Sequence, residues 1–531
     1  MRRDAGPDRP ITCGLGVVGG VVGIKRAADC ADFDSCRGRA RRRLWWPARD
    51  ESIKHFLVLG AAVLLGALGT VYHPFWGVLL YYTFSVLRPQ YLWDWSLPAR
   101  WRWSLIAAAI AAIGAFAHLP KLLAKNRVNL IVVLILALSV LLFLSTLTAH
   151  NPSLAQHYGI EYAKIIAIAL LACLVIDQLW QIRILAGMIL LMLGYVAYEV
   201  NYLYFIDHRL DIFHQGYGGL DNNGAGLMLV MGLPFAYAFA HCVRVHWQRV
   251  ACAVLGVLII HAVMMSYSRG AMLAAMVGVG WLLWHHRSKL QAAGMMVMLV
   301  AVVLALAGPE IRHRFMSTLD YQDDHSAQSR LDSWSAGWQM AWERPLLGHG
   351  IRNANLYSAN FGADVVGRTI HSQYLQMAAD CGLPAVAVYV CLVGSALMSL
   401  RRARVACRAY LQRSDADYWW GPIEDPEADE VRQVYHIALA CSASLLMFVT
   451  GGLFLSLELF ELPWLLIVTA AVLPLLVEKR IGLLAARATQ SATTSPEKAS
   501  RGSHRRRASR GRRASPRPRP GRALREGTVR P

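Results

Sequence analysis

The chain has 531 residues, of which 56% are hydrophobic and only 17% are charged. A soluble domain usually carries about a quarter charged residues. Here the apolar residues gather in runs of roughly twenty, each long enough to cross a hydrocarbon core of about 30 Å. This composition excludes an ordinary soluble globular protein and predicts an all-α, polytopic membrane protein.

The formal net charge of +20 is distributed unevenly, in a way that argues against a nucleic-acid-binding protein. Residues 478–531 carry 16 Lys/Arg against 3 Asp/Glu, and their basic stretch "RGSHRRRASRGRRASPRPRPGR" has no aromatic residue to stack on a base. We predict that this segment is a disordered cytoplasmic tail close to anionic lipid headgroups.

The cysteines and the N-terminal residues add little chemistry. Ten cysteines are scattered without a C-x-x-C pair or a metal-ligand spacing, so neither a disulfide framework nor a metal site is expected. Residues 1–52 contain the glycine-rich stretch "ITCGLGVVGGVVGI", which is too short to cross a membrane and is followed by no recognisable cleavage site. We expect residues 1–52 to be a disordered or mis-assigned extension.

Thirteen apolar segments follow in chain order. The candidate spans are residues 53–72, 75–91, 104–120, 129–148, 162–180, 183–203, 223–243, 249–267, 270–286, 290–308, 384–400, 436–456 and 460–477. Alternate crossing places the basic connectors "PKLLAKNR", "RVHWQR", "HHRSK" and "RRARVACRAYLQR" on one side, which assigns them and the tail to the cytoplasm. Thirteen spans would put the basic N-terminus outside. We therefore expect about 12 spans, with 75–91 as the re-entrant or misread segment.

These segments form two regions. Residues 53–203 are an N-terminal transmembrane region, and residues 204–477 are a second one that includes a large extracytoplasmic loop, 309–383. The loop has six Arg, eight Asp/Glu and no Lys, as a translocated loop permits.

Two helices are predicted within the loop. In the first, apolar residues repeat at spacings of three and four and predict one apolar face, ended by Pro345; they are Leu331, Trp334, Trp338 and Trp342. The stretch "HSQYLQMAADCGLP" predicts a second, short helix that ends at Gly382 and Pro384. We expect this loop to be folded and to pack on the membrane-embedded core.

Two arginines lie at the predicted outer face. Arg269, in "SYSRGA", lies where arginine is statistically disfavoured, and its burial is costly without an anion. A surface arginine that reaches into water is the alternative. Arg330 opens the first loop helix, where the helix dipole disfavours a cation. A ligand could explain it, and so could pairing with Asp332 or Asp324.

His371 begins the second loop helix. Its near-neutral pKa suits a group that accepts or donates a proton, although a hydrogen-bonded histidine at a helix start is the simpler reading of this residue alone. Asn222 and Asn223, in "GYGGLDNNGAG", are weaker candidates because turn chemistry explains them equally well. Together, two arginines and a histidine on one face suit a lipid-linked pyrophosphate, since arginine binds phosphate through bidentate bonds and stabilises its developing charge.

At these residues the chain resembles the O-antigen ligase and polymerase family of bacterial envelope glycosyltransferases. The resemblance covers roughly residues 200–477 and rests on "SRGA", "SRLDSWSAGWQMAWERPLLGHG" and "HSQYLQMAADCGLP". Two further stretches, "FWGVLLYYTFSVLRPQYLWDW" and "DNNGAGLMLVMGLPFAYAF", are similar to the O-glycosylation ligases associated with exosortase A systems.

The resemblance implies a multi-pass enzyme of the bacterial inner membrane, with its active site facing the periplasm and no cofactor or metal. The donor would be a glycan on undecaprenyl diphosphate, and the acceptor a hydroxyl of a lipid, polysaccharide or protein. Arg269 and Arg330 would hold the pyrophosphate, and His371 would activate or orient the hydroxyl. The further residues expected to bind substrate are Asn222, Asn223, Tyr267, Arg352, Arg368 and Gln373.

Other functions stay open from the sequence. A polysaccharide polymerase would add the glycan to a second lipid-linked copy, but such enzymes often have two substantial outer loops, and the loop at 204–222 is short. A transporter of lipid-linked or anionic solutes would have repeated halves and charges at mid-membrane, which the sequence does not show. A non-catalytic partner of an envelope assembly is the third possibility.

Overall fold

The computed structural model describes residues 50–93, 97, 101–124, 128–207, 216–306, 325–413, 425–457 and 459–508. Within these residues the secondary structure is helical, without a strand. The elements of the first half are α2 (Asp50–Tyr72), α3 (Phe75–Leu87), α4 (Pro89–Leu92), α5 (Trp103–Ala117), α6 (Leu119–Leu123), α7 (Leu130–Leu147), α8 (Pro152–Val175), α9 (Leu179–Tyr202) and the π-helical turn η2 (Leu203–Asp207).

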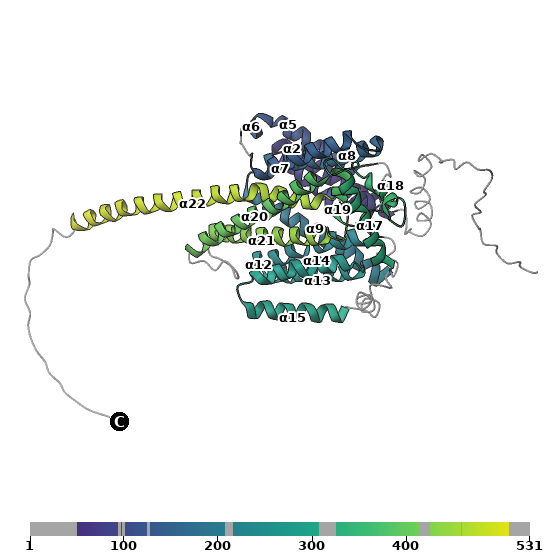
Figure 1. Cartoon of the computed structure of the whole chain (residues 1–531). Helices are drawn as coiled ribbons and strands as arrows, with labels where there is room; N and C mark the ends of the chain where they lie inside the picture. The colour runs from purple at the N-terminus through teal and green to yellow at the C-terminus, as the bar shows by residue number, and fades with distance from the viewer. Residues whose placement is uncertain are drawn as a thin grey trace, which may run out of the picture.

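The second half continues the bundle and adds the loop helices. Its elements are α11 (Asn222–Val230), α12 (Leu233–Cys242), α13 (His246–Met265), α14 (Arg269–His285), α15 (Lys289–Leu306), α17 (His325–Glu343), α18 (Ala354–Tyr357), η4 (Ser358–Phe361), α19 (Gln373–Cys381), α20 (Leu383–Arg413), α21 (Pro426–Gly451) and α22 (Glu461–Ala508). Figure 1 shows α17, α18 and α19 at one end of the bundle, at the right, whereas the C-terminal part of α22 projects from the other end.

Nine stretches in the described ranges are long and apolar enough to cross a membrane. They are Lys54–Tyr72, Leu130–Leu147, Pro152–Val175, Leu179–Ile206, Asn222–Cys242, His246–Met265, Leu383–Arg413, Pro426–Gly451 and Glu461–Arg487. This agrees with the predicted class, a polytopic all-α membrane protein. Four predicted spans are not among the nine: 75–91, the segment suspected of being misread, and 104–120, 270–286 and 290–308.

The core of the bundle lies around α21 and α22. In their apolar windows 83% and 78% of the residues are buried, against 11% for α2. The three helices α12, α14 and α20 pack on α21, and α20 also packs on α22. The centre of the molecule is therefore built from its C-terminal half, and α2 lies at the periphery (Figure 1).

Several helices begin or end outside the predicted spans, and a side-chain cap sets two of their starts. α8 begins at Pro152 instead of residue 162, since the Asn151 side chain accepts a hydrogen bond from the Leu154 amide at 3.2 Å. α21 begins at Pro426 instead of residue 436, where the Asp425 side chain caps it. α20 continues past the predicted end at residue 400 to Arg413.

The last helix extends beyond the predicted span 460–477, because α22 continues to Ala508. Ion pairs hold its first turns beyond 478 against α21: Arg480 Nε lies 2.9 Å from Glu430 Oε2, and Arg487 Nη1 lies 2.9 Å from Glu427 Oε1. The residues after 508, like the predicted extension at 1–49 and loop residues 309–324, lie outside the described part of the chain.

Both loop helices are confirmed as α17 and α19, and most of the predicted apolar face of α17 is exposed. Leu331, Trp338 and Trp342 are 47%, 52% and 57% exposed. The buried face is made of small residues and methionine, with Ala336 and Met340 both fully buried. Met340 packs there in a small separate core with Ala354, Ile370 and Ala379, which joins α17 to α18 and α19.

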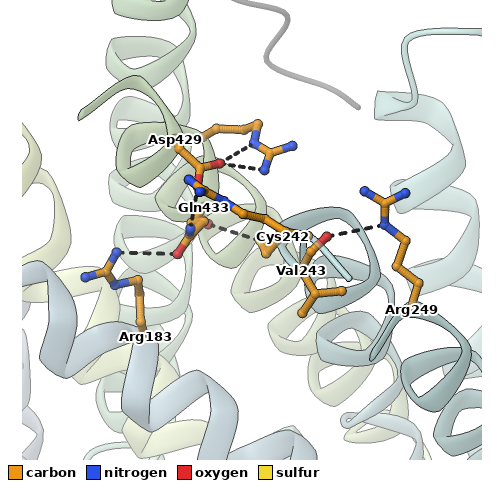
Figure 2. A network of polar contacts seen from close by, with 8 residues as sticks. Arg183, Cys242, Val243, Arg249, Asp429 and Gln433 are labelled. Carbon is orange, nitrogen blue, oxygen red and sulfur yellow. Dashed lines mark hydrogen bonds and ion pairs between the residues drawn. The ribbon is translucent and has the colours of Figure 1, made fainter. Parts of the chain in front are cut away.

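The opposite end of the bundle is fastened by a polar network (Figure 2). Asp429 of α21 accepts hydrogen bonds from Arg432 at 2.6 Å, from Arg244 at 2.7 Å and from Gln433 at 3.2 Å. Arg183 of α9 donates to the Gln433 side chain at 3.4 Å. Because Asp429 and Arg432 are almost fully buried, each satisfies the charge of the other. The network ties α9 and the segment after α12 to α21.

Candidate active site

The starts of α11 and α14 lie side by side, and each is capped by its own sequence. The Asp221 side chain accepts a hydrogen bond from the Gly224 amide at 2.8 Å, and the Ser268 side chain accepts one from the Ala271 amide at 3.2 Å. Arg269 is therefore the first residue of α14, at the same end of the bundle as the loop helices.

Polar contacts join these two helix starts. Asn222 Nδ2 donates to the Ser266 carbonyl at 3.1 Å, and Ser268 Oγ donates to Asn223 Oδ1 at 2.9 Å. The backbones approach so closely that a Cβ on Gly226 would lie 2.6 Å from Ser266 Oγ. Both predicted asparagines thus hold the segment that carries Arg269, and their side-chain contacts assign them a positioning role.

His371 precedes α19 in a constrained conformation. Its φ of 53° lies in the left-handed region, which few residues other than glycine adopt. The carbonyl of His371 accepts a hydrogen bond from Trp334 Nε1 at 3.3 Å, and the Ile370 amide donates to the buried Gln376 side chain at 3.1 Å. On the imidazole itself, Nε2 lies 3.4 Å from Thr369 Oγ1. The backbone around the ring is therefore fixed from both α17 and α19.

Gln373 ties the same segment to the end of α21. Its amide donates to the Gly452 carbonyl at 2.8 Å, and its side chain is 3% exposed. The side-chain oxygen Oε1 is buried without a hydrogen-bond partner among the described residues. A buried acceptor without a partner is costly, so it is a place where a donor from a ligand would be stabilising.

Burial lowers the pKa of His371 below its ordinary value of 6.5, and the nearby Arg330 guanidinium lowers it further. Arg368 also lowers the pKa of His371, whereas the carboxylates of Asp221 and Asp364 raise it. The imidazole is thereby kept neutral near pH 7, the state in which it can accept a proton. The Arg330 guanidinium and the Asp221 carboxylate before α11 therefore both act on the charge of the ring.

An aromatic pair connects the Arg269 segment to His371. A Cβ on Gly270, the residue after Arg269, would lie 3.4 Å from the Phe454 Cβ. The Phe454 ring lies 6.1 Å from the Trp334 ring, and Trp334 in turn donates to His371. The Phe454–Trp334 pair therefore lies between the segment that carries Arg269 and the segment that carries His371.

The remaining predicted residues have different surroundings. Arg368 forms an ion pair with Asp364 at 2.7 Å and donates to Ser329 Oγ, the residue before Arg330. It therefore fastens the chain before His371 to α17. Tyr267, with φ of 50°, forms the turn into α14.

Arg352 lies against the N-terminal region. Its φ is 62°, and its guanidinium carbon lies 5.0 Å from the centre of the Tyr158 ring of α8. It therefore belongs to the contact between the loop and the N-terminal region.

Sequence reasoning missed three residues that shape the site: Asp221, Ser268 and Phe454. The first two could have been found as helix caps, because each precedes a helix and accepts from an amide three residues on. Phe454 gave no such signal, because its contact with Trp334 joins segments far apart in the chain. In the described residues, no group of three or more His, Cys, Asp or Glu is placed to hold a metal ion.

The fold and these residues define a class: a multi-pass membrane protein with Arg269, Arg330 and His371 at one end of its bundle. Residues 254–390 match the family model described as O-Antigen ligase. The matched stretch runs from α13 into α20 and includes Arg269, Arg330 and His371. The match supports a glycosyl-transferring enzyme of envelope polysaccharide synthesis. No curated protein matches the chain.

Proposed function

We propose that the chain is an envelope glycan ligase that transfers a glycan from undecaprenyl diphosphate to a hydroxyl of a lipid, polysaccharide or protein. One observation carries the proposal. The three residues suited to lipid-linked pyrophosphate chemistry, Arg269, Arg330 and His371, fall within the stretch that matches the O-antigen ligase model and lie at the loop-bearing end of the bundle.

The proposed setting is the bacterial inner membrane, with about 12 spans and the loop 309–383 in the periplasm. Basic connectors support this orientation, because Arg244 and the basic end of α20 lie at the end of the bundle away from the loop helices. There Arg244 pairs with Asp429, and Arg404 lies 5.5 Å from the Trp281 ring centre.

In the proposed reaction the arginines act on the leaving group. The acceptor oxygen forms a bond to the anomeric carbon of the glycan, and the bond from that carbon to the phosphate oxygen breaks. Undecaprenyl diphosphate leaves with the electron pair. Arg269 and Arg330 stabilise the negative charge that develops on it, through charge-assisted hydrogen bonds.

His371 takes the proton of the attacking hydroxyl. Its lowered pKa keeps the ring neutral at the start, and the developing pyrophosphate charge favours the imidazolium that forms. The constrained backbone at His371 and its two flanking hydrogen bonds hold the segment that carries the ring without help from a substrate.

Within this class we infer the O-glycosylation ligase subgroup associated with exosortase A. The inference rests on the N-terminal stretch "FWGVLLYYTFSVLRPQYLWDW", which forms α3 and α4, and on "DNNGAGLMLVMGLPFAYAF", which forms α11 and most of α12. The two stretches approach each other in the fold, since Arg88 after α3 donates to the Gly218 carbonyl, three residues before Asp221.

The test is transfer by the reconstituted full chain. With labelled undecaprenyl-diphosphate glycan and candidate acceptors, it should release undecaprenyl diphosphate without added metal or nucleotide. Arg269→Ala and His371→Ala should each lower turnover by about a hundredfold or more. Matched controls are Arg402→Ala and His246→Ala, which change exposed residues near the opposite end of the bundle.

Other outcomes would identify other functions. A longer lipid-linked glycan as the product would indicate a polymerase. Movement of the labelled lipid across vesicles with no bond broken would indicate a transporter. Unchanged turnover in both the Arg269→Ala and His371→Ala proteins would remove these residues from the mechanism.

A further inference from the structure

A cavity of about 680 Å³ opens near the loop-bearing end of the bundle, outside the residues of the candidate site. It lies between the N-terminal region and the start of α22. Its lining combines aromatic rings with charged and amide groups: Tyr81, Phe84, Ser85, Arg88, Gln90, Tyr91, Trp101, Arg102, Ser104, Leu105, Ala108, His157, Glu161, Lys164, Ile165, Leu459 and Glu461.

Two side-chain oxygens in this lining are buried without a hydrogen-bond partner in the described part of the chain. The carboxylate oxygen Oε2 of Glu461 and the amide oxygen Oε1 of Gln90 have no hydrogen-bond partner among the described residues. Leaving such acceptors unsatisfied costs about 1–3 kcal/mol each, and more for a charged group. A ligand that brings donors into the cavity would remove this cost.

Arg88, like His371, has a positive φ. Among the described non-glycine residues, positive φ occurs at Arg88, Tyr267, Arg352 and His371. Arg88 Nη1 donates to the Gly218 carbonyl at 3.3 Å, and its guanidinium carbon lies 5.3 Å from the Tyr91 ring centre. The wall formed by Arg88 and Tyr91 is therefore fixed in place.

Two short stretches of chain connect the cavity to the candidate active site. The loop of Gly218 leads within three residues to Asp221, whose charge acts on His371. The Gly452 carbonyl accepts from Gln373, and the chain from there to Glu461 can span at most about 30 Å. An extended ligand of several linked units could therefore lie in the cavity and reach His371.

The chemistry of the lining points to one kind of ligand. Glu161 lies 2.6 Å from Lys164 and 3.4 Å from Arg102, so those cations are not available as an unopposed phosphate clamp. Mixed donors and acceptors suit hydroxyl groups, which both donate and accept. The rings of Tyr91 and Trp101, 52% and 45% exposed, offer apolar faces to the C–H faces of a sugar.

We propose that this cavity is a saccharide-binding site that holds sugar units of the glycan entering the transfer reaction. Trp101 and Tyr91 supply the stacking faces, and Glu461 and Gln90 accept hydrogen bonds from sugar hydroxyls. Its role in transfer rests on the proposed function, whereas its ability to bind sugar does not. The sugar can come from the donor glycan or from a glycosylated acceptor, because both present the same hydroxyl chemistry.

The first test is equilibrium dialysis of the purified full chain in a maltoside-free detergent with labelled maltotriose, mannotriose and triacetylchitotriose. At least one trisaccharide should bind saturably. Binding should weaken at least tenfold in Trp101→Leu and in Glu461→Gln, the latter keeping the size of the side chain. Trp247→Leu and Glu478→Gln are matched controls, exposed and far from the cavity, and they should bind as the unchanged chain does.

The proposal fails if no trisaccharide binds saturably, or if both cavity variants bind as the controls do. Displacement of the trisaccharide by inorganic phosphate at comparable concentration would also overturn it, because the cavity would then be an anion site. If Trp101→Leu does not fold, Glu461→Gln and Tyr91→Leu give the same comparison.

The second test separates the two sources of sugar. In the reconstituted transfer assay, Trp101→Leu should raise the KM of one substrate at least fivefold and leave kcat within twofold. A rise for the donor assigns the cavity to the donor glycan, and a rise for the acceptor assigns it to the acceptor. No change in either KM removes the cavity from transfer. If the unchanged chain transfers nothing, the proposed function fails, while the dialysis still decides whether the cavity binds sugar.

Discussion

At the scale of single residues, the candidate site depends on how charges around one imidazole balance. Burial lowers the pKa of His371 first, Arg330 lowers it further, and Asp221 raises it. A proton-accepting histidine must be neutral, and a lowered pKa extends the neutral form to pH values below 6.5. Activity that depends on this ring should therefore persist into mildly acidic solution.

Because Arg330 and Asp221 shift the pKa of His371 in opposite directions, removing either charge should shift the pH profile in opposite directions. Arg330→Gln removes a charge that lowers the pKa of His371, so the acid limb of kcat/KM should move to higher pH. Asp221→Asn removes a charge that raises this pKa but keeps a capping oxygen, so the limb should move to lower pH. The measurement is the pH profile of transfer. Limbs that coincide in both variants would show that His371 does not control the profile.

The left-handed backbone at His371 gives a second prediction. Asparagine adopts this region more readily than β-branched residues do. His371→Asn should therefore melt close to the unchanged chain while transfer falls by about 10²–10⁴. His371→Val should lose transfer and also be destabilised by about 1–2 kcal/mol. Equal melting temperatures for the two variants would contradict the argument from backbone strain.

At the scale of elements, the sequence predicts the helices better than it predicts their faces and ends. Hydropathy locates α8 and α21, but their first turns are polar and begin at caps that an apolar window does not detect. The spacing of Trp334, Trp338 and Trp342 predicts α17 correctly. It does not say which way the stripe points, because in a membrane protein an apolar face can be directed outward as well as inward.

For the candidate site, too, the sequence indicates the residues but not their contacts. Arg269, Arg330 and His371 could be selected from residue type and position in the chain. The contacts that bring their segments together could not, because Phe454 meets Trp334 across a separation that no local pattern records. The cavity at Glu461 was missed for the same reason, since its walls come from α3, α5, α8 and the start of α22.

At the scale of elements we predict that Asp380 of α19 holds the loop helices together. Its carboxylate accepts from the Ala354 amide at 2.8 Å and from Gln376 Nε2 at 2.8 Å, and Gln376 in turn fixes the residue before His371. Asp380→Ala leaves buried donors unsatisfied, at a cost of about 1–3 kcal/mol each. Limited proteolysis within residues 344–372 should therefore be faster than in the unchanged chain. Asp332→Ala, at an exposed position of α17, is the control, and equal cleavage rates would refute this role for Asp380.

At the scale of the whole molecule, the two ends of the bundle do different things. One end carries the loop helices and both polar sites. The other is fastened by Asp429, which accepts from Arg244, Arg432 and Gln433 (Figure 2). Ion pairs from Arg480 and Arg487 then hold the extension of α22 against α21. The sequence predicts basic residues at this second end but not their carboxylate partners.

Removing the buried carboxylate should therefore destabilise the whole bundle. Asp429→Ala removes the carboxylate that pairs with Arg432, which is 1% exposed, and breaking such a buried pair costs about 3–5 kcal/mol. Glu427→Ala removes more exposed pairs on the same helix and should cost no more than about 1 kcal/mol. Thermal unfolding in detergent measures both. A similar loss in the two variants would contradict the difference in burial.

The contacts between the loop and α7–α8 also determine which part of the chain is the smallest folding unit. The Ser145 hydroxyl donates to the Asp380 carbonyl at 2.8 Å, the Asn151 amide donates to Asn353 Oδ1 at 2.7 Å, and the His150 amide donates to the His349 carbonyl at 3.0 Å. Residues 309–383 expressed alone would lack all three anchors. The N-terminal region is thus a scaffold for the loop that carries His371 rather than an accessory to it, and a truncated chain that begins at residue 204 should be inactive in the transfer assay even if it inserts into the membrane.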